Sequence, residues 1–314
     1  MENQVKKQIG ERIVEHLKRG EGYTPRYNPY SLGKLAKQVG VSKTTLSNMK
    51  NESWSGISSE IWSKVQTYFG VDGWALGSTK NFVKIKNACE DAQGNSRLIA
   101  IAGITGGGKT SALEHYTKNH QNVFYLHCNS TMTQKGFLKA MLVKMGFTPL
   151  GSREVMRDRI IEALQLLEHP LFVFDDFTKV GKEIYAIIQQ LYDELTVKNS
   201  CGIIISGVEK LRDIVFSAAM QNRLFFPEFQ NRISAWKRLE TPIREEVKGL
   251  LKINAPFIET KEEIDYIYSV VKDREFRTLR TLVQNYTIAL PIGLEKGMTR
   301  IEILASLRTN HDWV

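Results

Sequence analysis

The chain has 314 residues, of which 42% are hydrophobic and 25% are charged, as is usual for a globular protein in water. This length predicts about two domains, and the lack of an apolar run long enough to span a bilayer excludes an integral membrane class. The three cysteines are far apart, follow no metal or redox spacing and accompany no signal-peptide core, so we expect reduced thiols in a cytoplasmic protein. The net charge of +9 favours a polyanionic partner, nucleic acid before membrane.

A helix–turn–helix pattern lies within the first unit, which we place at residues 1–78. Leu32–Val39 carries the apolar stripe of a first helix, Gly40 allows the left-handed turn that ends it, and Ser42 caps a second helix. Large apolar residues that follow are expected to supply the supporting core: Trp54, Ile57, Ile61, Trp62, Val65, Tyr68 and Phe69.

The second helix of this pattern combines short polar side chains, which suit base edges, with lysines, which suit phosphates. We therefore expect DNA contacts from its outward-facing residues: Lys43, Thr44, Thr45, Ser47, Asn48 and Lys50. A small helical interaction domain that does not touch DNA is the alternative, because a fold does not dictate a function.

A phosphate-binding loop follows at Gly103–Thr110, which matches G-x-x-x-x-G-K-[ST] without a mismatch after the apolar run Leu98–Ala102. Glycines let backbone N–H groups wrap a phosphate chain, and a helix that starts here adds its positive end. Lys109 would reach the β- and γ-phosphates, and the Thr110 hydroxyl would hold Mg²⁺. The predicted ATP-binding residues are Gly103, Thr105, Gly106, Gly107, Gly108, Lys109, Thr110 and Ser111.

Strands and helices alternate through a second predicted unit, residues 79–240, which indicates an α/β doubly wound parallel sheet. The apolar runs that suit buried strands are Leu98–Ala102, Val123–His127, Leu171–Phe174 and Ile203–Ser206. Helical periodicity appears between them at Thr110–Asn119, Gln134–Met145, Arg153–Glu168 and Lys182–Lys198. Residues 241–314 predict a helical lid, with helices at Pro242–Ile253, Lys261–Lys272, Arg274–Ala289 and Thr299–Arg308.

An acidic partner for the metal stands at the end of the third apolar run. The carboxyl end of a buried strand would deliver Asp175 beside the phosphates, where open α/β sheets bind their ligands. Asp175 is expected to position Mg²⁺, and Asp176 is expected to orient the attacking water.

Arginines are expected to stabilise the charge that develops on the transferred phosphoryl group, often from a neighbouring subunit. Arg232, which follows the fourth strand and its helix, is our candidate for that role, with Arg223 as the alternative. In the lid, Arg280 could reach the phosphates from above, and Arg277 is a weaker choice.

These motifs together resemble the AAA+ ATPases, and the plan of a helix–turn–helix, a short linker and a compact module with a small lid is similar to the phage Mu B transposition protein family. The resemblance implies a P-loop AAA+ parallel sheet with a small helical lid, preceded by an all-α lambda-repressor-like domain. It also implies a DNA-stimulated ATPase that uses ATP and Mg²⁺. Its subunits would form a helical filament on double-stranded DNA, mainly without sequence preference, select the target and activate a transposase.

The resemblance also implies roles for particular residues. Asp176 departs from the Glu that is common in AAA+ proteins, so slow hydrolysis is expected. The sensor position at the end of the fourth strand falls on either Ser206 or Val208. Lys135 and Lys139, with Lys144 nearby, lie where this family places DNA contacts.

Two other functions are compatible with the same residues. One is an ATP-regulated transcription factor, in which the helix–turn–helix reads a defined operator and ATP switches the oligomeric state. The other is a helicase loader or replication-initiation ATPase, which would bind a ring helicase in place of a transposase.

Overall fold

The computed structural model describes most of the chain, in segments that we give by number: 3–18, 30–58, 61–62, 65, 69, 76–196, 201–221, 226–255, 257–258, 260–273 and 279–309. Of the residues named in the sequence analysis, Tyr68, Arg223 and Arg277 lie outside these described residues, as do the predicted helix bounds Lys198 and Arg274. None of the helices within the described segments combines the length and the apolarity that crossing a bilayer requires.

Five parallel strands form one sheet in the order β2-β3-β4-β1-β5. Because β1 lies between β4 and β5, the loop that leaves its carboxyl end emerges near the middle of the sheet, where ligands of open α/β sheets bind. The predicted parallel sheet is therefore confirmed. The strands are β1 (Leu98–Ala102), β2 (Val123–His127), β3 (Leu171–Asp175), β4 (Gly202–Gly207) and β5 (Ile233–Arg238).

The fifth strand was not among the apolar runs of the sequence. In β5 only Ile233 is buried, and the remaining positions are partly or fully exposed. Within the described sheet, β5 is an edge strand that pairs only with β1, so it needs little apolar surface. A mixed sequence such as Ser-Ala-Trp-Lys-Arg carries no run that marks a buried strand, and the pattern could not reveal it.

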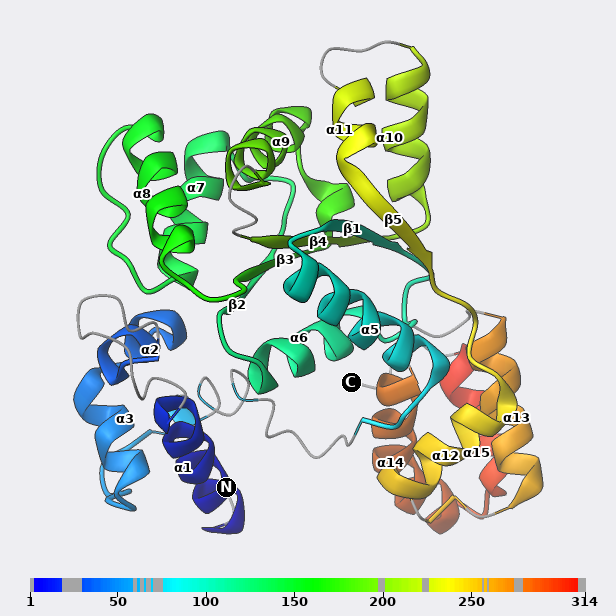
Figure 1. Cartoon of the computed structure of the whole chain (residues 1–314). Helices are drawn as coiled ribbons and strands as arrows, with labels where there is room; N and C mark the ends of the chain where they lie inside the picture. The colour runs from blue at the N-terminus through cyan, green and yellow to red at the C-terminus, as the bar shows by residue number, and fades with distance from the viewer. Residues whose placement is uncertain are drawn as a thin grey trace.

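Helices cover both faces of the sheet, as Figure 1 shows. On one face lie α5 (Lys80–Asn95) and α6 (Lys109–Asn119). The opposite face is covered by α7 (Gln134–Lys144), α8 (Arg153–Gln165), α9 (Lys182–Thr196), α10 (Lys210–Met220) and α11 (Phe226–Arg232). Each face has its own cluster of buried apolar residues, which gives a three-layer α/β/α module.

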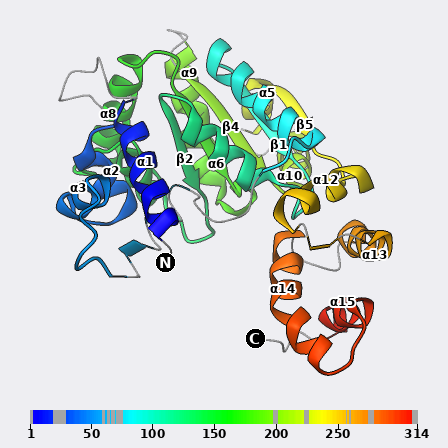
Figure 2. The same ribbon diagram turned by 90° about the horizontal axis from the view of Figure 1, so that it is seen from below.

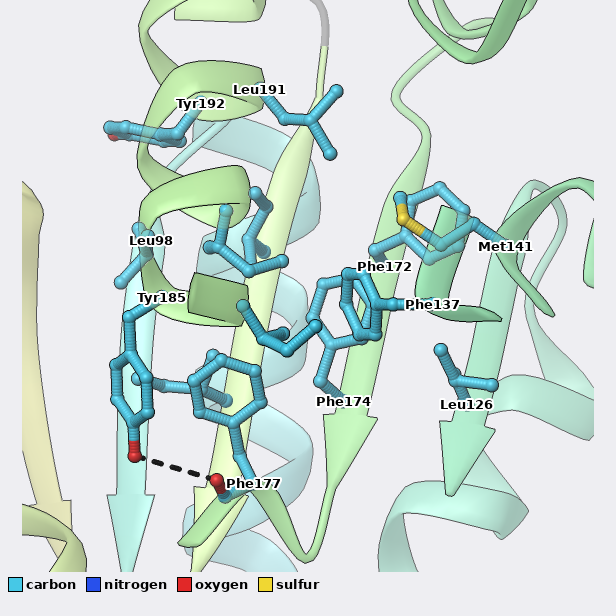
Figure 3. Packing of buried hydrophobic residues seen from close by; sticks show 14 of the residues in the cluster. Leu98, Leu126, Phe137, Met141, Phe172, Phe174, Phe177, Tyr185, Leu191 and Tyr192 are labelled. Atoms are coloured by element: carbon cyan, nitrogen blue, oxygen red, sulfur yellow. Dashed lines mark hydrogen bonds between the residues drawn. The ribbon is translucent and has the colours of Figure 1, made fainter. Parts of the chain in front are cut away.

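Aromatic rings fill the core on the α7–α9 face (Figure 3). Phe172 and Phe174 of β3 stack with their ring centroids 5.3 Å apart, and Phe137 of α7 lies 5.1 Å from Phe174. Beyond the strand, the Tyr185 hydroxyl donates to the Phe177 carbonyl at 3.4 Å. This packing anchors the turn that follows β3, and so fixes the acidic end of that strand.

The N-terminal helices are α1 (Asn3–Lys18), α2 (Leu32–Val39) and α3 (Lys43–Lys50). Gly40 ends α2 with a φ of 76°, and Ser42 accepts a hydrogen bond from the Thr45 N–H at 2.9 Å to cap α3. Leu46 and Met49 are fully buried against α1 and α2. The predicted pair of helices and its turn are therefore present, while their assignment to a lambda-repressor-like DNA-binding domain stays a prediction.

These helices pack against the module beside β2, as Figures 1 and 2 both show. The Tyr30 hydroxyl accepts a hydrogen bond from the backbone N–H of Asn122, just before β2, and the Gln38 amide donates to the carbonyl of Lys144. The ammonium of Lys34 lies 4.5 Å from the centroid of the Phe147 ring. We refer to this contact region as the N-terminal seam.

The lid consists of α12 (Arg244–Asn254), α13 (Lys261–Lys272), α14 (Leu279–Glu295) and α15 (Arg300–Thr309), which share a separate apolar cluster. Its buried Glu263 is satisfied by the Tyr286 hydroxyl at 2.7 Å and by Arg300. Separate groups of core residues thus accompany the N-terminal helices, the two faces of the sheet and the lid. They support the division 1–78, 79–240 and 241–314, which we keep as a proposal.

Candidate nucleotide site

The P-loop connects the end of β1 to the start of α6, as its motif requires. Gly106 and Gly108 have φ values of 79° and 82°, in the left-handed region that favours glycine. Gly103, the first glycine of the motif, is needed for a different reason, because a Cβ at this position would lie 2.5 Å from the Cβ of Leu239. Thr105 is exposed at the tip of the loop.

Lys109 is the first residue of α6 and is only 8% exposed. Its ammonium donates to the carbonyls of Gly103 and Ile104, at 2.9 and 2.7 Å, inside the loop. Burial lowers the pKa of Lys109, and the carboxylates of Asp175 and Asp176 oppose that effect. A phosphate group would supply the negative charge that this ammonium needs in a dry environment.

Thr110 and Asp175 meet at the carboxyl end of β3. The Thr110 hydroxyl donates to Oδ2 of Asp175 at 2.6 Å, and the Tyr125 hydroxyl of β2 donates to the same oxygen at 2.9 Å. Asp175 is fully buried, and its Oδ1 accepts the backbone N–H of Asp176. Burial and the nearby Asp175 raise the pKa of Tyr125, so that its hydroxyl remains a donor.

The donor set fits the predicted Mg²⁺. This cation prefers oxygen ligands and is usually held by one or two protein groups together with substrate phosphates and water. Thr110 and Asp175 bring a hydroxyl and a carboxylate together beside Lys109 and the loop glycines. In the described part of the chain, no three His, Cys, Asp or Glu side chains gather into a metal site of their own. A metal shared with a phosphate chain is therefore the arrangement that these residues suit.

Asp176 stands next to the phosphate loop but is already engaged. It has a φ of 56°, and its Oδ2 lies 2.5 Å from the ammonium of Lys179 and 3.6 Å from Nε2 of His127. His127 is the last residue of β2, directly opposite Asp175 in the ladder. Asp176 would therefore have to orient a water molecule while its carboxylate also contacts Lys179 and His127.

The structure distinguishes the two candidates for the sensor position. Ser206 lies within β4 opposite Ile101 of β1, whereas Val208 is beyond the end of the strand. Ser206 is fully buried, and among the described residues its Oγ has no hydrogen-bond partner. It alternates along β4 with Ile205 and is therefore on the same face as Ile204, which packs with the helix that follows the P-loop. We accordingly propose Ser206.

Arg232 lies at the opposite end of the sheet strands from the P-loop of its own chain. It ends α11, and the next residue, Ile233, pairs with Leu98 at the beginning of β1. The five residues of β1 span roughly 16 Å at about 3.3 Å each, so Arg232 cannot reach its own P-loop. Its guanidinium pairs with Asp193 of α9. Arg280 is in the first turn of α14, and its approach to the phosphates stays a prediction.

The predicted DNA-contacting residues lie on two helices, α3 and α7, and not on the P-loop or the ends of β1 and β3. On α7, Lys135 and Lys139 are four residues apart and both exposed. On α3, Lys43 and Thr44 are exposed, and four further residues are partly exposed: Thr45, Ser47, Asn48 and Lys50. Their role in binding DNA stays a prediction.

Three residues of the site were missed by the motifs. Tyr125 and His127 lie on the predicted strand Val123–His127, but nothing local connects them with Asp175. The β2–β3 pairing brings them there, and a sequence pattern does not show which strands are neighbours. Of the three, Lys179 could have been found from the sequence, because it follows Asp176 by three residues and that spacing in a turn allows an ion pair.

The fold and this site define the central module as a P-loop AAA+ domain. Residues 92–215 match the family model described as AAA domain. Among solved structures, Cdc6p from Pyrobaculum aerophilum has a TM-score of 0.53 and 14% identity, over 74% of this chain and 67% of that chain. The Aeropyrum pernix ORC2 protein has a TM-score of 0.54 and 12% identity, over 79% of this chain and 72% of the other. These two likenesses show the fold.

A relative in sequence indicates a narrower group within the AAA+ class. The chain is 22% identical over 187 residues to the Mu-like prophage FluMu DNA transposition protein B of Haemophilus influenzae. The match spans 56% of this chain and 64% of the length of that relative. Together with the AAA domain, this likeness confirms the predicted resemblance to the AAA+ ATPases of the Mu B transposition family.

Proposed function

We propose that this protein is an ATP-dependent, DNA-binding AAA+ ATPase that assembles on duplex DNA, selects a transposition target and activates a transposase. The observation that carries the ATPase proposal is the contact of Thr110 with Asp175 beside Lys109 in a P-loop. The transposition proposal is supported by the likeness to a transposition protein B.

The site has residues for each part of phosphoryl transfer. Lys109 and the loop N–H groups would hold the β- and γ-phosphates, while Thr110 and Asp175 would hold Mg²⁺, which supplies neutralising charge when bound. Asp176 would orient the attacking water, and Ser206 would contact the γ-phosphate from β4. Because Asp is shorter than Glu and is paired with Lys179, slow turnover is the expected outcome.

Assembly is supported by the position of Arg232. A cation that is a strand length away from its own P-loop can contribute only to the site of another subunit, and such a contribution makes hydrolysis depend on oligomerisation. Asp193 would hold the guanidinium until a neighbouring subunit arrives.

DNA binding is supported by the net charge of +9 and by the exposed lysines of α3 and α7. Contacts of lysines with phosphates are largely independent of sequence, so the affinity should fall steeply as salt is raised. A protein of this kind would coat duplex DNA of many sequences.

Electron microscopy of the purified protein with long duplex DNA tests the proposal. We expect filaments with Mg²⁺ and a non-hydrolysable ATP analogue but not with ADP, and none for Lys109→Ala with either nucleotide. Lys118→Ala, on the same helix, is the matched control and should assemble normally. The absence of any nucleotide-dependent assembly on DNA would remove the proposal.

A footprinting experiment on duplex DNA distinguishes the transcription-factor alternative from target selection. Protection of one palindromic site, lost on substitution of Thr44 or Asn48, would favour it, whereas diffuse protection of any duplex agrees with target selection. Stimulation of strand transfer by a purified transposase would complete the test. Capture of a ring helicase instead would favour the loader alternative.

A further inference from the structure

The first turn of α5 contains a buried amide that connects the P-loop with the start of the lid. Asn81 is 7% exposed, and its Nδ2 donates to the carbonyl of Glu240 at 2.7 Å and to the carbonyl of Gly107 at 3.4 Å. Its Oδ1 accepts the backbone N–H of Glu240 at 3.0 Å. A side-chain amide has two donor hydrogens, so Asn81 can satisfy both carbonyls. With its oxygen it also accepts from Glu240, and it therefore pairs with both backbone groups of that residue, as a neighbouring strand would.

The chain between β5 and α12, residues 239–243, is the hinge segment through which the sheet continues into the lid. The neighbours of Asn81 hold both ends of it. The backbone N–H of Lys80 donates to Oε1 of Glu246 at 2.6 Å, and Oε2 of Glu246 accepts the N–H of Ile243 at 2.9 Å. Lys84 donates to the carbonyl of Arg238 at 2.9 Å and lies 3.0 Å from the Glu240 carboxylate.

The P-loop also touches the hinge segment directly. The position of a Cβ on Gly103 would lie 2.5 Å from the Cβ of Leu239, the first residue of the segment. Thus two glycines of the loop, Gly103 and Gly107, meet the hinge segment, one by packing and one through the Asn81 amide. A rotation of the lid about this segment would move Glu240 and would strain or break the pair with Asn81.

We propose that Asn81 is a positioning residue that couples the placement of the P-loop to the orientation of the lid, so that the lid angle and ATP turnover depend on the same amide. The proposal rests on the proposed ATPase function for its effect on turnover. The coupling itself is a property of the fold and can be measured without nucleotide.

The test variant is Asn81→Asp. The carboxylate can still accept the N–H of Glu240, but in place of the donor it turns an oxygen toward the carbonyls of Glu240 and Gly107. Asn87→Asp is the matched control, because Asn87 is exposed on the same helix and gains the same charge. Should Asn81→Asp fail to fold, Glu246→Gln takes its place as the test variant. It exchanges one of the two carboxylate oxygens, which accept the N–H groups of Lys80 and Ile243, for an amide donor.

The lid orientation is measured in the full chain by the spin–spin distance between labels on Asn119→Cys and Lys272→Cys. Both positions are exposed, and the native Cys89, Cys128 and Cys201 are buried. We expect a broader distance distribution for Asn81→Asp than for the wild type or Asn87→Asp, with or without nucleotide. We also expect faster hydrogen exchange in both the P-loop and the hinge segment.

Steady-state kinetics with Mg·ATP give the second readout. Substitutions that disturb a hinge change kcat and KM together. Because Asn81 holds Glu240 of the hinge segment, we expect both to move in Asn81→Asp, with kcat/KM reduced about tenfold, the size expected for the loss of one buried hydrogen bond. A loss of folded protein alone would lower kcat and leave KM unchanged.

An unchanged distance distribution in a folded Asn81→Asp protein overturns the coupling, whatever the kinetics show. So does a change in hydrogen exchange that is confined to either the P-loop or the hinge segment. If the protein binds no ATP at all, the proposed function fails, while the distance and exchange measurements still decide the coupling.

Discussion

The hydroxyl of Thr110 donates to the carboxylate of Asp175 at 2.6 Å, which joins the first turn of α6 to the end of β3. These residues are 65 positions apart in the chain, and the contact arises because β1 and β3 lie on either side of β4 in a parallel sheet. It puts a neutral and a charged oxygen ligand side by side, so both halves of the proposed metal site depend on one hydrogen bond.

Replacing Asp175 with asparagine should abolish most of the ATPase activity and leave the fold intact. We expect kcat/KM to fall on the order of a hundredfold, because the metal contributes several kcal/mol to phosphoryl transfer. The measurement is phosphate release as Mg²⁺ is varied. Asp158→Asn, an exposed position on α8, is the control and should behave as the wild type. Near-normal turnover in Asp175→Asn would exclude Asp175 as the metal acid.

Replacing Ser206 with alanine should separate activity from stability. Since the buried Oγ has no hydrogen-bond partner in the described structure, its removal should leave the melting temperature unchanged or raise the stability by up to about 1 kcal/mol. ATP turnover should nevertheless fall about tenfold if this hydroxyl contacts the γ-phosphate. Thermal unfolding and kinetics on one preparation check both points, with Ser217→Ala on the exposed face of α10 for comparison. A clear loss of stability with normal kinetics would assign Ser206 a structural role.

Arg232 should act in another subunit, and mixing two inactive variants can show it. Arg232→Ala should lower turnover about a thousandfold or more. Because its pair with Asp193 is largely exposed, the free energy of unfolding should change by less than about 1 kcal/mol. Combined with Asp176→Asn, which should still bind ATP, assemble and offer its arginine, the Arg232→Ala protein should regain part of its activity. A mixture that stays as inactive as its components would contradict action in trans.

The N-terminal seam should become stronger as pH rises. Burial lowers the pKa of Lys34, and the nearby charge of Lys37 lowers it further. The docked form therefore binds fewer protons than the separated form, and raising pH from about 7 toward 10 favours docking. The Lys34 ammonium has no hydrogen-bond partner in the described structure, so Lys34→Met should dock more tightly at neutral pH and lose the pH dependence.

Energy transfer between labels on α1 and α8 can follow docking at the N-terminal seam across this pH range. Lys18→Met, exposed on α1, is the control and should retain the wild-type response. A second variant opposes docking: at Gly146, where φ is 81°, a side chain would meet Lys34 at 2.4 Å, so Gly146→Val should dock less. Weaker docking of Lys34→Met at neutral pH would show that the cation–π contact with Phe147 outweighs the burial of the charge.

The parts of the fold with strong local signals could be predicted from the sequence. Leu98–Ala102 and Val123–His127 have the predicted bounds, because each begins with apolar residues that are buried under the helices of the two faces. The P-loop and Asp175 were found for a similar reason, since each depends on residues adjacent in the chain. β5 was missed because an edge strand tolerates polar residues.

Contacts between distant segments could not be predicted in this way. Tyr125 reaches Asp175 through strand pairing, and Asn81 reaches Glu240 across 159 positions in the chain. Neither residue belongs to a motif, and both are ordinary in their local context. The choice between Ser206 and Val208 likewise needed the register of β4 against β1, which the sequence leaves undetermined by one or two residues.

β2 has a contact of consequence at each end. Just before its start, the backbone N–H of Asn122 donates to the Tyr30 hydroxyl. Toward its other end, Tyr125 donates to Asp175, the last residue of β3, and His127 lies near Asp176, the residue that follows. All five residues of the strand pair with β3, from Val123 opposite Leu171 to His127 opposite Asp175. β2 therefore has contacts both with the part of the chain proposed to read DNA and with the part proposed to cleave ATP.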